Sequence, residues 1–163
     1  MRVIVCDSGP VIHLSEISQL DLLKNCGAIH VPSLVCEEVQ RNIKIEWPSW
    51  IKINRLKPTE KNRAEFWGNT GDLHRGETEA FELFKRLDAD WFLTDDAGAR
   101  LFVSNIGFEV HGTLGIILWN LANRHIDKEQ TEKSIHNLRK SSLWLSEMII
   151  QKAVQAVHDI SNF

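Results

Sequence analysis

The chain is predicted to adopt an α/β fold of three layers (α/β/α), with a mainly parallel central sheet and a helical C-terminal part. Short apolar runs alternate with amphipathic helical segments along the first two thirds of the sequence. Runs such as residues 2–6 and 91–94 alternate little, as expected for strands covered on both faces. With 163 residues, 43% of them hydrophobic and 25% charged, we expect one domain over 1–163.

The first part of the chain contains three predicted strands. They are expected at residues 2–6, 28–32 and 49–56, the last of them half exposed. Pro10 suits the first turn of a helix, and Ser18 with Asp21 resembles a capping box for a short helix that reaches Gly27. Ser33 is expected to cap the following helix.

The middle and the end of the chain are predicted to be mostly helical. Residues 57–75 are polar and contain Gly and Pro, which favours a long loop with some helix. A clear amphipathic helix is expected after Gly76. The other expected elements are a strand at 91–94, a helix ending near Gly107, a strand at 108–110 and helices from Thr113, over 127–140 and over 146–158 with Ser146 as its cap.

Acidic side chains stand at four separated places, each where an apolar run gives way to a turn or helix. They are Asp7, Glu38, Glu77 with Glu79, and Asp95 with Asp96. Since ligands of parallel sheets bind at the carboxyl ends of strands, Asp7 and the pair Asp95/Asp96 are expected at such a site. Glu38 lies on or beside the apolar stripe of its helix, which is unusual for a solvated Glu.

Several converging carboxylates indicate a divalent-metal pocket. Mg²⁺ and Mn²⁺ prefer oxygen ligands, and such an ion can activate water for attack on a phosphodiester. The structural alternative is that each acid caps a helix and complements its dipole. Asp7, between an apolar run and a Ser-Gly-Pro turn, is the acid least easily explained in that way.

The order of these motifs resembles that of the PIN-domain family, the metal-dependent ribonucleases that include the VapC-type toxins of toxin-antitoxin pairs. The matching segments are VIVCDSGPVIHL, VPSLVCEEV, GETEAFEL, LTDDAGAR and HGTLGIIL, from residue 3 to about residue 118. The last segment also resembles a branch of short PIN proteins. The resemblance implies a three-layer PIN-like fold and ribonuclease activity with Mg²⁺ or Mn²⁺ as cofactor.

The resemblance also implies roles for individual residues. The catalytic carboxylates would be Asp7, Glu38, Glu79 and Asp96. Further metal ligands or outer acids would be Glu77 and Asp95, oriented together with the others by Ser8 and Thr94. Many relatives have Asp at the third motif, so the choice between Glu77 and Glu79 stays open.

Basic residues near the motifs are candidate contacts for RNA. Arg75 precedes the third motif and Arg100 follows Asp96 by one helical turn, so both are expected near a phosphate. An Asp96–Arg100 ion pair is the alternative. A basic and aromatic cluster stands in the predicted loop: Lys57, Lys61, Arg63 and Trp67. Trp67 would either stack an unpaired base or anchor the loop to the core.

Other patterns restrict the class of protein. The net charge of −3 gives no overall basic surface. Three cysteines match neither a CxxC pair nor a zinc module, so we expect reduced thiols and a cytoplasmic location. No signal peptide or membrane span is recognised, and no membrane partner is expected. Serine-nucleophile, P-loop and HExxH motifs are missing from the sequence, and of the histidines only His74 lies near a motif.

Three functions are compatible with the sequence. The first is a metal-dependent endoribonuclease acting on RNA, in particular the toxin of a toxin-antitoxin pair. The alternative is a catalytically degraded PIN-fold module that binds RNA or a partner. The third is another α/β phosphoryl-transfer protein. A phosphatase of the Asp-x-Asp type is disfavoured because Gly9 stands where that motif has its second Asp, and a receiver domain is disfavoured because this chain has no paired acid after its first strand. The apolar last helix, with Met148, Ile149, Ile150, Val154 and Val157, favours a homodimer or an antitoxin partner. Complete burial of the helix within the monomer is the alternative.

Overall fold

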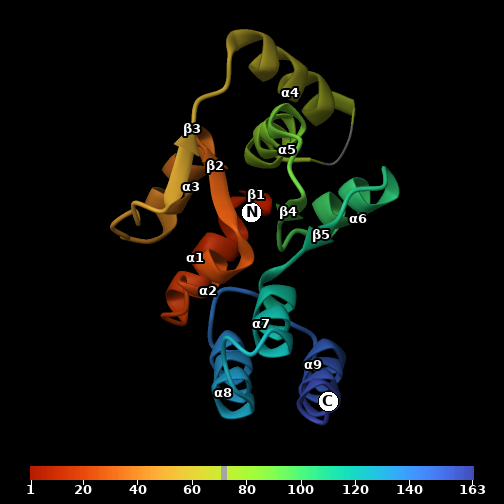
Figure 1. The fold of residues 1–163 in the computed structure, drawn as a ribbon. Coiled ribbons are helices and arrows are strands. Elements are labelled where there is room, and N and C mark those ends of the chain that lie inside the picture. Colours follow the sequence, from red (N-terminus) through yellow and green to blue (C-terminus); the bar gives the residue numbers. More distant parts are fainter. Residues whose placement is uncertain (71–72) are drawn as a thin grey trace.

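The computed structural model describes residues 1–70 and 73–163 and has a parallel sheet at its centre (Figure 1). Five strands form this sheet in the order β3-β2-β1-β4-β5, and every neighbouring pair is parallel. The strands are β1 (Val3–Cys6), β2 (Ala28–Pro32), β3 (Ile51–Asn54), β4 (Trp91–Leu93) and β5 (Val110–His111). The predicted α/β class with a parallel sheet is thus confirmed.

Helices connect the strands and form the C-terminal part. They are α1 (Ser8–Glu16), α2 (Leu22–Cys26), α3 (Ser33–Asn42), α4 (Pro58–Thr70), α5 (Arg75–Leu87), α6 (Ala97–Asn105), α7 (Thr113–Ala122), α8 (Lys128–Leu138) and α9 (Glu147–Ser161). Among the described residues, no helix is both long enough and apolar enough to cross a membrane.

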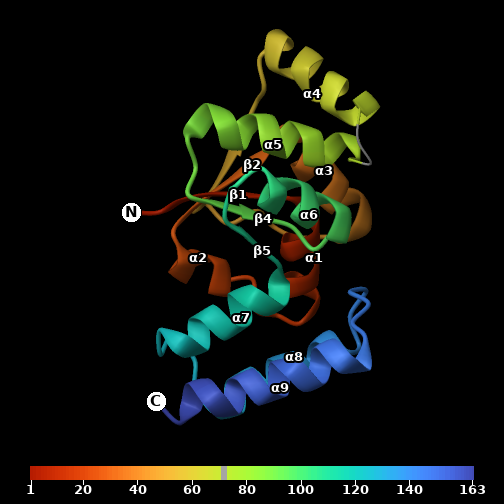
Figure 2. The ribbon, with the colours of Figure 1, turned by 90° about the vertical axis from the view of Figure 1, so that its right-hand side faces the viewer.

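Both faces of the sheet are buried, as the apolar strands predict. Successive side chains of a strand point to opposite faces, so Ile4 and Cys6 enter one core whereas Val5 enters the other. The first core lies beneath α1, α2 and α7, and the second beneath α5 and α6. Figure 2 shows these layers, with α4 outside α5 and with α8 and α9 beyond α7.

The C-terminal helices have a small core of their own. It contains Leu121, Ile135, Ile150, Ala153 and Val157, from α7, α8 and α9. The predicted cap of α9 is confirmed, because the backbone N–H of Ile149 donates to Ser146 Oγ at 3.2 Å.

The loop predicted for residues 57–75 is wrong over most of its length, because Pro58–Thr70 forms α4; residues 71 and 72 lie outside the described part. Pro58 starts the helix, where its missing N–H costs nothing. The carboxylate of Glu60 accepts a hydrogen bond from the Lys57 backbone N–H at 2.6 Å, which closes the first turn. Few residues of α4 are buried, so the sequence shows no regular apolar stripe from which a helix could be predicted.

Two predicted helix caps are also wrong. Ser18 has a left-handed backbone (φ +58°) between α1 and α2, so it caps neither helix, and α2 begins only at Leu22. Ser33 is the first residue of α3, and its hydroxyl donates to the Asn54 carbonyl at 3.2 Å. Ser33 therefore fastens α3 to the end of β3.

The strand order reverses at β1, which places a crevice at the carboxyl ends of β1 and β4. Connections from β1 proceed to β2 and β3 on one side, and β4 and β5 lie on the other. Open α/β sheets bind ligands at such a switch point. The backbone N–H of Asp7 donates to the Leu93 carbonyl at 2.9 Å, so the two strand ends are held together there.

Candidate functional site

Asp7 follows β1 directly and is buried, with only 5% of its surface exposed. Its Oδ2 accepts a hydrogen bond from Thr94 Oγ1 at 3.2 Å, whereas its buried Oδ1 has no hydrogen-bond partner in the part of the chain that the structure describes. Burial raises the pKa of Asp7 to about 7. The Ser8 backbone N–H and the Thr94 hydroxyl oppose this shift, and the carboxylates of Glu77 and Glu38 add to it. A buried carboxylate oxygen of this kind is satisfied by a proton, a water molecule or a bound ion.

Glu38 enters the site from α3 because Val35 and Val39 bury the adjacent stripe of that helix. A Cβ atom on Gly76 would lie only 2.5 Å from Glu38 Oε2, so glycine at this position makes room for the carboxylate. Burial raises the pKa of Glu38, while a hydrogen bond with the Ser8 side chain lowers it. Ser8 thus contacts Glu38, which agrees with the orienting role expected for it.

Glu77 lies in the first turn of α5 and is buried, with 6% exposed. Its Oε2 accepts a hydrogen bond from the backbone N–H of His74 at 2.8 Å and so closes the N-terminus of the helix. Burial raises the pKa of Glu77, and the nearby carboxylates of Asp96 and Glu38 raise it further. Glu77 is therefore both a helix-capping residue and a member of an acidic group.

Asp96 is the N-cap of α6, and its Oδ1 accepts a hydrogen bond from the backbone N–H of Ala99 at 2.8 Å. The hydroxyl of Thr94 links it to the first acid: Thr94 Oγ1 accepts from the Asp96 backbone N–H and donates to Asp7, both at 3.2 Å. Thr94 thus fixes the relative positions of two carboxylates. We call the group of Asp7, Glu38, Glu77 and Asp96 the acidic cluster.

Glu79 lies outside this cluster. Two residues along a helix correspond to about 200°, so Glu79 leaves α5 on a different side from Glu77. It lines a separate cavity of about 650 Å³, where its Oε1 is 3.9 Å from Arg75 Nε. Burial raises the pKa of Glu79, but the charges of Lys61 and Arg75 lower it. The geometry groups Glu77, rather than Glu79, with Asp7.

Asp95 is held by hydrogen bonds to other elements. Its Oδ1 accepts from the Thr113 backbone N–H at 2.7 Å, and its Oδ2 accepts from Thr113 Oγ1 at 2.5 Å. The same Oδ2 is 2.6 Å from His13 Nδ1. Gly112 leaves room for this arrangement, since a Cβ there would be 2.8 Å from Asp95 Oδ1. Asp95 therefore connects β4 to α1 and α7, and both of its oxygens are already occupied.

The two candidate arginines have different surroundings. The side chain of Arg75 is 68% exposed and faces Glu79. Arg100 is exposed on α6, and its guanidinium lies near Gly112. Within residues 1–70 and 73–163 no ion pair joins Arg100 to Asp96, so the guanidinium can contact an external anion.

Two members of the basic and aromatic cluster predicted for residues 57–67, Arg63 and Trp67, have structural contacts. Trp67 packs edge-on against Phe81 and Phe102, and its Nε1 donates to Glu82 at 3.0 Å. Glu82, only 1% exposed, also accepts from Arg63 Nε at 2.9 Å. Trp67 therefore anchors α4 to α5. Of the two roles expected for it, base stacking and anchoring to the core, the structure shows the second.

Oxygen ligands in the acidic cluster fit a hard divalent cation. The unpartnered Oδ1 of Asp7 and the mutual repulsion of Asp7, Glu38 and Glu77 would both be relieved by such an ion. As the side chains stand, the described residues form no ready-made cage of three or more His, Cys, Asp or Glu groups. Closing around an ion would require side-chain rotation.

Sequence reasoning missed Gly76, His13 and Thr113. The glycine that precedes the third acidic motif offered a signal, because glycine in a helix is unfavourable without a close contact. His13 and Thr113 are ordinary residues in sequence, and only the fold brings them to Asp95.

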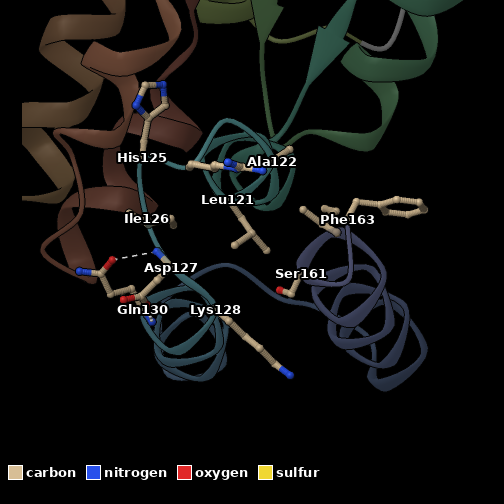
Figure 3. Close-up of a pocket in the computed structure, with 11 residues that line it drawn as sticks. Leu121, Ala122, His125, Ile126, Asp127, Lys128, Gln130, Ser161 and Phe163 are labelled. Carbon is tan, nitrogen blue, oxygen red and sulfur yellow. Dashed lines mark hydrogen bonds between the residues drawn. The ribbon is translucent and has the colours of Figure 1, made fainter.

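A second cavity lies far from these acids, among the C-terminal helices (Figure 3). Its volume is about 880 Å³, and Leu121, Lys128 and Ser161 line it from α7, α8 and α9. The hydrogen bond drawn there, from the Asp127 backbone N–H to Gln130 Oε1 at 3.0 Å, belongs to the capping box of α8. No member of the acidic cluster lines this cavity, so we place the chemistry at the sheet edge.

Comparison with known proteins agrees with the fold. The model of the PIN-domain family matches residues 3–159. Searches of curated proteins and of solved structures found no match. The family match covers nearly the whole chain and confirms the resemblance suggested by the acidic motifs. The chain belongs to the PIN-domain family.

Proposed function

We propose that the protein is a metal-dependent endoribonuclease that hydrolyses RNA at the acidic cluster, with Mg²⁺ or Mn²⁺ as cofactor. PIN domains are generally nucleases and usually use divalent ions, so a nuclease-type function follows from the family. RNA as the substrate and the identity of the metal are parts of the proposal. The observation that supports it best is the buried, unpartnered Oδ1 of Asp7 beside three other carboxylates.

Each acidic residue would have a distinct task in this reaction. Asp7, Glu77 and Asp96 would hold the ion, which when bound supplies an activated water and neutralises charge on the phosphate. Thr94 keeps Asp7 and Asp96 in register through its hydroxyl. Glu38, whose pKa is raised by burial, would accept a proton from the attacking water, since a raised pKa makes a carboxylate a better base.

Cleavage of labelled single-stranded RNA by the purified protein tests the proposal. We expect cleavage with Mg²⁺ or Mn²⁺, none with chelator, and at least a ~100-fold loss for Asp7→Asn, the effect typical of losing a preorganised charge-stabilising group. Asp21→Asn is the matched control, because Asp21 is exposed and makes no capping hydrogen bond. A folded wild-type protein that cleaves no RNA with either metal would exclude the enzyme.

A catalytically inactive PIN module is the second candidate. The observation that favours it is that the described side chains do not already enclose an ion. It predicts that wild type binds RNA without cleaving it and that Asp7→Asn binds equally well. Calorimetric titration with Mn²⁺ separates the two candidates, since only the enzyme requires binding that is lost in Asp7→Asn.

We also propose that the protein acts in the cytoplasm as a toxin, paired with an antitoxin or with a second copy of itself. Cys6, Cys26 and Cys36 are free thiols, which suits a reducing compartment. On α9, Ile150 and Val157 are buried, whereas Met148 is 63% exposed and Ile149 and Val154 are each 38% exposed. Light scattering of the purified protein tests the dimer, and growth arrest on expression tests the toxin.

A further inference from the structure

The cavity that contains Glu79 lies next to the acidic cluster, on a different side of α3 and α5. Six charged residues from α3, α4, α5 and the segment after β3 line it: Arg41, Arg55, Lys61, Arg75, Glu37 and Glu79. Four cations thus face two carboxylates, in a chain whose net charge is −3. We call this cavity the basic pocket; its local charge suits an anionic ligand.

The two carboxylates of the basic pocket neutralise only part of its positive charge. Glu37 Oε2 is 3.7 Å from Arg41, and buried Glu79 is 3.9 Å from Arg75. Among the described residues, no carboxylate lies within ion-pair distance of Arg55 or Lys61. These two exposed cations are therefore available to phosphate oxygens.

An apolar wall adjoins these cations. Ile53 on the edge strand β3 is 47% exposed, and Leu34 and Leu56 also line the pocket. A simple anion would need only the charges. A nucleotide can use both surfaces, because its phosphate meets the cations while its base covers apolar carbon.

The basic pocket is continuous in sequence and space with the acidic cluster. Glu37 lines the pocket and Glu38 belongs to the cluster, and the Cα atoms of consecutive residues are only ~3.8 Å apart. On α5, Arg75 likewise lines the pocket, whereas Glu77 belongs to the cluster. Figure 1 shows α3 beside β3, with α5 over the sheet, and residues of α3 and α5 contribute to both the pocket and the cluster.

We infer that the basic pocket binds the single-stranded RNA that flanks the scissile phosphate, with Arg55 and Lys61 on backbone phosphates and Ile53 against a base. This inference rests on the proposed function, because RNA is taken as the substrate. The inference also gives Glu79 a role: Glu79 lies on the side of α5 that faces the basic pocket, and its carboxylate holds Arg75 in position there.

The test measures binding of a labelled single-stranded RNA by fluorescence anisotropy without metal, in the Asp7→Asn background to prevent cleavage. The double change Arg55→Ala/Lys61→Ala should weaken binding at least ~10-fold, and the salt dependence of log K should fall by ~1.4, or ~0.7 for each lost phosphate contact. The matched control Lys24→Ala/Lys152→Ala removes two exposed cations from α2 and α9 and should change neither value.

A glutamate-rich peptide of the same net charge serves as the competing probe. If this peptide binds more tightly than the RNA and loses binding with the same double change, the pocket is a protein-docking site and the inference is overturned. Equal loss of RNA binding in the Lys24/Lys152 control would also overturn it, because nonspecific attraction would then account for the affinity.

The outcomes separate this inference from the proposed function. In the active background, Arg55→Ala/Lys61→Ala should raise KM for RNA and leave kcat unchanged. Pocket-dependent RNA binding by a wild-type protein that cleaves nothing would support the inference while refuting the nuclease. Metal-dependent cleavage with a KM insensitive to both pocket residues would refute the inference alone.

Discussion

The acidic cluster and the basic pocket occupy two sides of the same helices, and they differ in charge because of spacings of one or two residues. Glu38 enters the cluster while Glu37 lines the pocket, and Glu77 and Glu79 divide in the same way. Each residue along a helix turns the side chain by about 100°. Adjacent acids in one motif can therefore serve opposite purposes.

The neighbours of the two α5 acids define that difference. Burial raises the pKa of both Glu77 and Glu79. The hydrogen bond from His74 lowers the pKa of Glu77, whereas the carboxylates of Asp96 and Glu38 each raise it. The largest charge effects on Glu79 come from Lys61 and Arg75, which lower its pKa, and the carboxylates of Glu37 and Glu38 raise it less. Glu77 would thus gain from a bound cation, and Glu79 already has partners of opposite charge.

The largest expected effect comes from exchanging these two acids for amides. Glu77→Gln should reduce RNA cleavage at least ~100-fold and weaken Mn²⁺ binding, because the charge is lost from the cluster. The fold should survive, since the glutamine oxygen can still accept from the His74 N–H. Glu79→Gln should keep Mn²⁺ affinity and kcat and change mainly KM. Steady-state kinetics and calorimetry measure both.

The opposite outcome for these two variants would contradict the assignment of Glu77 to the cluster. If Glu79→Gln abolishes metal binding while Glu77→Gln leaves it intact, the third ligand is Glu79, as the motif comparison first suggested. The separation of cluster and pocket on α5 would then be wrong.

The second expected effect concerns Gly76 on α5, which makes room for the Glu38 carboxylate. Gly76→Ala places a methyl group 2.5 Å from Glu38 Oε2, so the carboxylate must move. We expect a ~10- to 100-fold loss of cleavage, as for displaced groups that support a metal site. Gly68→Ala on α4 is the matched control, because its nearest contact is an ordinary 3.7 Å. The measurements are the cleavage rate and the melting temperature.

The control also tests stability. Alanine is a better helix former than glycine by up to ~1 kcal/mol, so Gly68→Ala should raise the melting temperature slightly and leave cleavage unchanged. Unchanged activity in Gly76→Ala would mean that Glu38 does not need its present position.

The strand ends and their acids were predictable from the sequence for a simple physical reason. Strands buried on both faces are apolar without a break, so residues 28–32 are recognised with correct bounds and Asp7 is seen to follow a strand directly. Parallel strands bring their carboxyl ends to one edge, which places Asp96 near Asp7.

Contacts between distant segments were not predictable. Asp95 looks equivalent to Asp96 in sequence, yet its oxygens are occupied by Thr113 and His13, which come from other elements. Helix α4 was missed because a half-buried Trp67 and a capping Glu60, rather than a regular apolar stripe, fasten it. A single sequence contains no record of such tertiary pairings.

The third prediction concerns the pH dependence of stability, because burial and neighbouring carboxylates raise the pKa of Asp7 in the acidic cluster. The pKa of Asp7 rises from 3.8 to about 7 on folding, so the folded state binds its proton more tightly than the unfolded chain. Stability without metal should therefore fall as pH rises from about 4 to about 7, by up to ~1.4 kcal/mol per pH unit from Asp7. Urea denaturation measures this.

Two variants isolate the contribution of the cluster. Asp7→Asn should flatten the decline and leave the protein more stable above pH 7, whereas Asp21→Asn should keep the wild-type profile, since Asp21 is exposed. Saturating Mn²⁺ should stabilise wild type at pH 8 by ~2.7 kcal/mol at 100 times its Kd, and Asp7→Asn much less. An identical slope in wild type and Asp7→Asn would mean that Asp7 is ionised throughout.

The smallest expected effect distinguishes the structural acid from the acidic cluster. Asp95→Asn removes the charge that strengthens the hydrogen bonds from Thr113 and the contact with His13, so we expect a loss of about 1–2 kcal/mol in unfolding free energy. For a chain of this length that is a drop of about 2–8 °C in melting temperature. Mn²⁺ affinity should stay within threefold of wild type, because neither oxygen of Asp95 is free for a metal. Calorimetric loss of Mn²⁺ binding at unchanged melting temperature would instead place Asp95 among the ligands, and its bonds to α1 and α7 would then be secondary.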